Sequence, residues 1–94
     1  MRKADWALIG YIKRSKNRYR ALEFLETPLI PSELGKKMEI SLTHASKIIR
    51  ELNEKKLISC LNEDLKVGRI YQITKQGKRI KKNLLNLTKI SDKR

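Results

Sequence analysis

Hydrophobic side chains recur at helical spacing in three successive segments of the first half of the chain. The first covers residues 15–26, and the second covers residues 31–38 and opens on a proline, which suits the first position of a helix. The third covers residues 42–55 and follows Ser41, a favourable N-cap residue. Its apolar side chains share one side of a helix and are Ala45, Ile48, Ile49 and Leu52. A short helix, a tight turn and a longer helix together predict a helix-turn-helix unit.

The pattern changes after residue 56. Residues 57–61 and 69–74 are short runs rich in β-branched and aromatic side chains, which predict two strands, and the polar residues 62–68 predict the loop of a hairpin between them. From Thr74, which can serve as an N-cap, residues 75–90 again place apolar side chains on one stripe and predict a last helix. The sequence therefore predicts a mainly α protein with a small β-hairpin (α+β).

Residues 5–14 are compatible with two structures. Asp5 can cap a helix that has Ile9 and Ile12 on one side, whereas the alternation that begins at Trp6 also suits a strand. We favour the helix, and we expect this segment to contribute to dimerisation together with the last helix.

The whole chain is expected to form one domain. Its 94 residues leave no room for a second domain, and we treat residues 1–94 as a unit with a core at about residues 15–80. The longest apolar run, residues 6–12, is too short to span a membrane. The basic residues 13–16 stand where a secretory signal would have its small-residue cleavage site. Cys60 is the only cysteine, so no intramolecular disulfide is expected and the reducing cytoplasm is the expected compartment.

The charge is strongly basic and unevenly distributed. The chain holds 23 Lys and Arg against 10 Asp and Glu, a net charge of +13. Five bases and no acid fall within residues 13–20, and eight bases with one acid fall within residues 75–94, whereas residues 21–40 hold four acids and two bases. Clustered like charges repel unless a partner neutralises them, so this distribution predicts a nucleic-acid-binding surface. An anionic membrane ranks below nucleic acid because the chain lacks a basic amphipathic helix with a broad Trp, Phe and Leu face.

Polar and basic side chains occupy the side of residues 42–55 that lies opposite the apolar stripe. Short hydrogen-bonding side chains near the start of a helix, followed by Lys and Arg, suit insertion into the major groove, where Arg can bridge O6 and N7 of guanine. We predict base or backbone contacts of this helix with double-stranded DNA at Thr43, His44, Ser46, Lys47 and Arg50.

Two further groups of residues are expected to contact DNA outside the major groove. The loop of residues 62–69 is expected to reach the adjacent minor groove or its backbone through Lys66 and Arg69. Phosphate contacts position a protein on DNA without reading its sequence. We expect them from Lys16, Arg18, Ser32, Lys36 and Lys37.

Five stretches of the sequence, in this order, resemble the MarR/ArsR-type winged helix-turn-helix transcriptional regulators, and particularly their small archaeal-type members. They cover about residues 15–80. They are Ser15-Lys16-Asn17-Arg18 with Ala21-Leu22 and Leu25, Pro31-Ser32-Glu33-Leu34-Gly35, Ile40 to Leu52, Leu57-Ile58, and Gly68 to Thr74 with Gly77. The resemblance implies a winged helix-turn-helix fold, with a three-helix DNA-binding core followed by a C-terminal helix.

Two positions depart from the pattern of these regulators. Lys56 stands where they usually have glycine, so the turn after residues 42–55 must form without the residue that most easily adopts a positive φ. Gly35 stands where they usually have alanine, which should allow residues 31–38 to pack more closely on residues 42–55.

These features predict a sequence-specific, double-stranded DNA-binding transcriptional regulator. One winged domain reads only a short stretch of DNA, so we expect a homodimer. Its contacts are expected at Ile80, Leu84 and Leu87, which could instead pack within their own domain. The alternative function is a module that binds DNA architecturally without sequence preference, or that belongs to an RNA or ribonucleoprotein assembly.

Catalysis is not expected, because the sequence has no Gly-rich phosphate loop and no Ser/His/Asp or Cys/His arrangement at recognisable spacing. His44 is the only histidine and Cys60 the only cysteine, so no metal site and no cofactor are expected. The sequence does not identify a small-molecule effector.

Overall fold

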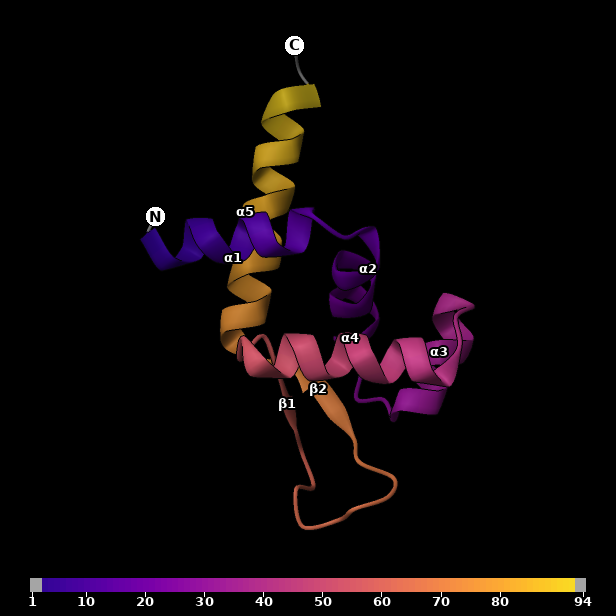
Figure 1. Cartoon of the computed structure of the whole chain (residues 1–94). Coiled ribbons are helices and arrows are strands. Elements are labelled where there is room, and N and C mark those ends of the chain that lie inside the picture. The colour runs from indigo at the N-terminus through magenta and orange to yellow at the C-terminus, as the bar shows by residue number, and fades with distance from the viewer. Residues whose placement is uncertain (1–2, 93–94) are drawn as a thin grey trace.

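Five helices and a two-stranded antiparallel hairpin make up residues 3–92, the part that the computed structural model describes, with side chains described for residues 3–87. In chain order they are α1 (Lys3–Lys13), α2 (Lys16–Phe24), α3 (Pro31–Met38), α4 (Leu42–Glu54), β1 (Ile58–Cys60), β2 (Tyr71–Ile73) and α5 (Lys75–Asp92). Figure 1 shows α2, α3 and α4 grouped together, the hairpin extending below α4, and α1 crossing α5. The predicted fold class, a winged helix-turn-helix with a three-helix core and a C-terminal helix, is confirmed.

Side-chain hydroxyls cap three of these helices, as the sequence predicted. Ser15 and Ser41 each accept a hydrogen bond from the backbone N–H three residues further on, at 3.3 and 3.1 Å. The Thr74 hydroxyl accepts a hydrogen bond from the Gly77 N–H at 3.0 Å and donates one to the carbonyl of Lys56 at 2.8 Å. These bonds satisfy backbone donors that the first turn of a helix leaves free.

The first segment is a helix, and the strand alternative is wrong. Ile9 and Ile12 are buried, at 3% and 0% exposed, whereas Trp6 is 52% exposed. A strand would have placed Trp6 and Ile12 on the same face. The helix instead directs both isoleucines into the core that α2, α4 and the hairpin share. The side chains that are almost completely buried there are Ile12, Leu22, Leu25, Leu34, Met38, Leu52, Leu57, Ile58 and Ile80.

The turn between α3 and α4 depends on one left-handed residue and one glycine. Glu39 adopts φ 58°, and the Ile40 N–H returns to the Gly35 carbonyl at 2.9 Å. A Cβ on Gly35 would lie 3.2 Å from the carbonyl oxygen of Ile40 and 3.5 Å from the Cβ of Ala45. The close packing of α3 on α4 that we expected from Gly35 is therefore present.

Lys56 takes the conformation that a glycine would take in the turn after α4. Its φ is 60°, and the following residue, Leu57, donates its N–H to the carbonyl of Leu52 at 3.0 Å. A non-glycine residue in this region costs roughly 1–3 kcal/mol. The start of α5 lies against this turn, because a Cβ on Gly77 would come within 2.2 Å of the Leu57 carbonyl oxygen.

The hairpin strands are shorter than the predicted ranges 57–61 and 69–74. Their paired residues are Ile58 with Ile73, Ser59 with Gln72, and Cys60 with Tyr71. Beyond Cys60 the side chain of Asn62 replaces a strand partner, since its Oδ1 accepts the N–H of Ile70 at 2.8 Å. Leu29 adds an isolated antiparallel bridge to Tyr71 and so joins the segment before α3 to the hairpin.

The last helix packs on α1 and on the core. The Asp5 carboxylate, 5% exposed as a residue, receives two hydrogen bonds from the Arg79 guanidinium, at 3.1 and 3.2 Å. Ile80 and Leu84 are 0% and 7% exposed and pack in the core of their own chain, the alternative that the sequence left open. The dimer contacts expected at these residues stay a prediction, and Leu87 is half-buried against the same core.

None of the helices within the described part of the chain has both the length and the apolar character needed to cross a membrane.

Candidate nucleic-acid interface

The outer face of α4 carries the residues that the sequence singled out for DNA contact. Thr43, His44, Lys47 and Arg50 are exposed, and Ser46 is half-buried. Burial of the apolar stripe fixes the rotation of the helix, so the opposite side must face solvent. Within the described residues, neither Lys47 nor Arg50 forms a hydrogen bond or an ion pair, which leaves both cations free for a partner.

Arg18 has a different role from the phosphate contact that we expected. Its guanidinium donates a hydrogen bond to the carbonyl of Tyr11 at 2.8 Å and lies 3.8 Å from the centre of the Tyr11 ring. Its Nε lies 3.6 Å from a carboxylate oxygen of Glu51 on α4, and only 18% of its side chain is exposed. Arg18 therefore connects α1, α2 and α4, and its charge is directed inward.

The ring of Tyr11 provides a neutral face for this contact. Burial raises the pKa of the Tyr11 hydroxyl above its ordinary value, an effect that the charge of Arg18 opposes and the carboxylates of Glu51 and Glu54 reinforce. The phenol stays protonated at neutral pH. Lys55 approaches the same ring at 5.2 Å, so two cations, one from α2 and one from the end of α4, lie within cation–π distance of one aromatic ring.

The expected phosphate contacts on α3 divide into two environments. Lys36 and Lys37 are exposed in the last turn of the helix, and Ser32 is exposed in its first turn. A carboxylate oxygen of Glu33 accepts the N–H of Ile30 at 3.0 Å, so the helix start already carries a negative group. A phosphate would meet less attraction at this start than a bare helix N-terminus would offer. Lys16 is exposed at the beginning of α2, as a phosphate contact requires.

The two cations predicted for the wing, the loop of residues 62–69, are used differently. Lys66 is exposed and makes no hydrogen bond or ion pair with the described residues. Arg69 is half-buried, and its guanidinium donates to the backbone carbonyls of Leu65 at 2.6 Å and Glu63 at 3.2 Å. Arg69 therefore stabilises the loop, because its guanidinium donates hydrogen bonds to carbonyl oxygens of the loop itself.

The wing also exposes apolar side chains that our sequence analysis did not single out. Leu61, Leu65 and Val67 are 54%, 46% and 86% exposed. Leu65 and Val67 stand two residues apart in a polar loop, and Leu61 directly precedes it; exposed apolar side chains in so polar a segment are the signal that the sequence offered.

No group of three or more His, Cys, Asp and Glu side chains among the described residues could hold a metal ion. Cys60 is half-buried in β1 and its Sγ lies 3.4 Å from Oδ1 of Asn62.

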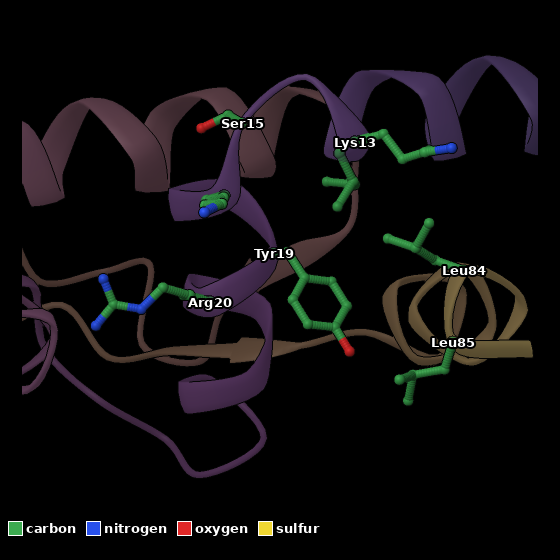
Figure 2. Close-up of a pocket in the computed structure, with 8 residues that line it drawn as sticks. Lys13, Ser15, Tyr19, Arg20, Leu84 and Leu85 are labelled. Atoms are coloured by element: carbon green, nitrogen blue, oxygen red, sulfur yellow. The ribbon is translucent and has the colours of Figure 1, made fainter. Parts of the chain in front are cut away.

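A groove with a volume of about 480 Å³ lies where α1, α2 and α5 meet, and our sequence analysis did not predict it. Figure 2 shows the ring of Tyr19 facing Leu84 and Leu85 of α5, with Lys13 and Arg20 pointing outward on opposite sides. The lining residues are Ile12, Lys13, Ser15, Lys16, Tyr19, Arg20, Leu84 and Leu85. They combine apolar walls with three cations and no carboxylate.

Comparison with known proteins supports the fold. The structure is similar to the crystal structure of a MarR family transcriptional regulator from Silicibacter pomeroyi, with a TM-score of 0.66 and 12% sequence identity, covering 97% of this chain and 68% of that one. Neither the protein-family models nor the curated proteins compared with the chain gave a match. The chain thus has a MarR-like winged helix fold.

Proposed function

We propose that this protein is a sequence-specific, double-stranded DNA-binding transcriptional regulator. The observation that carries the proposal is the outer face of α4, where Lys47 and Arg50 are exposed beside Thr43 and His44 and make no hydrogen bond or ion pair with the part of the chain that the structure describes. A helix of 13 residues with this face fits the major groove, and Arg50 can donate to two acceptors of one guanine. The fold shared with a MarR family transcriptional regulator supports the same function.

We further propose that residues around α4 hold it in register on the duplex. Lys16, Lys36 and Lys37 provide exposed cations for phosphates, and Lys66 provides one for the minor groove or backbone next to the α4 site. Arg18 and Arg69 support these contacts from inside, by orienting α4 and the wing.

The proposed regulator acts as a homodimer in the cytoplasm and needs no cofactor or catalytic group. A two-fold dimer would place two copies of α4 on a palindromic site. Because Ile80 and Leu84 are buried, the exposed Trp6 of α1 is the better anchor for a partner.

Selection from a pool of random duplex DNA, followed by competition binding, tests this function. We expect a recurrent site that is bound ~10³-fold or more tightly than unrelated duplexes at physiological salt. Affinities that differ by less than tenfold among unrelated duplexes would instead indicate an architectural DNA-binding protein. Tighter binding to structured RNA than to any duplex DNA would indicate a ribonucleoprotein module.

A further inference from the structure

The tip of the wing and the groove between α1, α2 and α5 have complementary properties. The wing tip, residues 63–67, contains the exposed acids Glu63 and Asp64 and the exposed apolar residues Leu65 and Val67. The groove has apolar walls and the cations Lys13, Lys16 and Arg20. Acids beside apolar groups on one surface therefore correspond to cations beside apolar groups on the other.

Hydrogen bonds within the loop fix the conformation of the wing tip in the absence of a partner. Arg69 holds the carbonyls of Glu63 and Leu65, and the Asn62 side chain donates to the Gly68 carbonyl at 3.2 Å. Gly68 adopts φ 74°, in the left-handed region, where the chain turns back toward β2. A loop fixed in this way loses less conformational entropy on binding than a flexible one.

The charge of the acidic side chains argues against DNA as their partner. Two acids against the single cation Lys66 leave residues 63–67 with one net negative charge, on a chain whose net charge is +13. The phosphate backbone repels Glu63 and Asp64, whereas a cation-rimmed apolar groove attracts them. The same chain presents such a groove.

We propose that the wing tip of one copy docks in the α1–α2–α5 groove of a second copy bound next to it on DNA. Figure 1 shows the wing on one side of α4, and α1, α2 and α5, which bound the groove, on the other, and in this proposal the copies are related head to tail. Val67 and Leu65 fill the groove beside Tyr19 and Leu85, and Glu63 and Asp64 face Lys13 and Arg20. The contact rests on the proposed DNA binding, because phosphates remove the repulsion between two chains of charge +13.

Charge reversal tests the contact on a duplex with one selected site and on a duplex with two such sites separated by whole helical turns of about 10.5 base pairs. The wild-type chain should bind the tandem duplex cooperatively. Glu63→Lys with Asp64→Lys, and separately Lys13→Glu with Arg20→Glu, should each lower the cooperativity about tenfold. Combining all four substitutions should restore it. A matched control combines Glu63→Lys and Asp64→Lys with Lys78→Glu and Lys82→Glu, which has the same net charge and should not restore it.

The ratio of tandem to single-site affinity separates this contact from DNA binding itself. Equal ratios for the wild-type chain and both reversed variants, or equal recovery in the combined variant and its control, would overturn the contact. The contact would also be overturned if Val67→Ser weakened binding to the single-site duplex and left the ratio of tandem to single-site affinity unchanged. That result would indicate that the tip is inserted in DNA. Loss of site preference with an intact ratio would count against the proposed function alone.

A cross-linking experiment does not depend on a selected site. Chains with Val67→Cys and chains with Lys13→Cys, both also carrying Cys60→Ser, are mixed with random duplex DNA under mild oxidation. We expect a disulfide between the two kinds of chain in larger yield than with Lys82→Cys in place of Lys13→Cys. Equal yields would overturn the docking.

Discussion

At the scale of single residues, exposed cations of this protein are not equivalent. Arg50 projects from a rigid helix whose opposite side is fully packed, whereas Lys66 projects from the wing loop. A guanidinium on a helix can donate to two acceptors of one base, whereas an ammonium group acts as a point charge. We therefore assign base reading to Arg50 and backbone attraction to Lys66.

The substitution Arg50→Ala is expected to weaken binding to the selected site by ~1–3 kcal/mol and to relax base preference. Lys66→Ala should weaken binding about equally for all sequences and lower the slope of log affinity against log salt by about one. Competition binding at several salt concentrations measures both effects. Identical behaviour of the two variants would reject the division of roles.

Two glycines in helices should respond oppositely to alanine. A Cβ on Gly77 would come within 2.2 Å of the Leu57 carbonyl oxygen, whereas nothing lies within 4 Å of one on Gly10. Gly77→Ala should lower the free energy of unfolding by ~1–3 kcal/mol, because backbone must move. Gly10→Ala should raise it by ~0.5–1 kcal/mol through helix propensity. Urea denaturation measures both, and similar effects of the two substitutions would contradict this reasoning.

At the scale of elements, the orientation of α4 depends on more than its own apolar stripe. Arg18 of α2 connects the carbonyl and ring of Tyr11 on α1 with Glu51 on α4. The helix start at Ser41 and the turn at Lys56 fix its two ends. The exposed side of α4, for which we propose DNA contact, is thus set by its neighbours as well as by its sequence.

Replacement of Arg18 distinguishes an internal role from a phosphate contact. Arg18→Ala should lower the free energy of unfolding by ~1–3 kcal/mol, through loss of the cation–π contact and a charged hydrogen bond. It should leave the salt slope of DNA binding unchanged. Lys16→Ala, its neighbour on α2, should lower that slope by about one and have little effect on stability. A lower slope for the Arg18 variant would show that its charge contacts DNA after all.

At the scale of the whole molecule, α1 and α5 pack on each other and contribute to the same hydrophobic core as the other helices. The buried carboxylate of Asp5 on α1 accepts two hydrogen bonds from Arg79 on α5, a residue 74 positions further along the chain. Ile80 and Leu84 of α5 are buried in the core of their own chain. Trp6 of α1 is 52% exposed, so its apolar surface could contact a partner related by a two-fold axis.

The substitution Trp6→Ala is therefore expected to shift the free protein from dimer toward monomer, because a large apolar contact is lost. Sedimentation equilibrium measures the change, and thermal unfolding should show little loss of monomer stability. Trp6→Phe serves as a control that keeps most of the apolar area. A dimer unaffected by Trp6→Ala would place the two-fold contact elsewhere.

Residue spacing alone was enough to determine most of the fold. The periods of the apolar side chains and the hydroxyl caps at Ser15, Ser41 and Thr74 are local properties, and they located the helices and the exposed face of α4. The resemblance to MarR/ArsR-type regulators, which usually have glycine at this position, pointed to the unusual turn at Lys56.

The partner of each charged or apolar side chain was decided only by tertiary structure. Arg18 and Arg69 look like surface cations in sequence, and Ile80 and Leu84 could have faced either the core or a second copy. Their final contacts come from segments far away in the chain or from the carbonyls of a folded loop, and so does the groove between α1, α2 and α5. Periodicity specifies which side of a helix is buried, whereas the distance between two side chains exists only after the helices have packed.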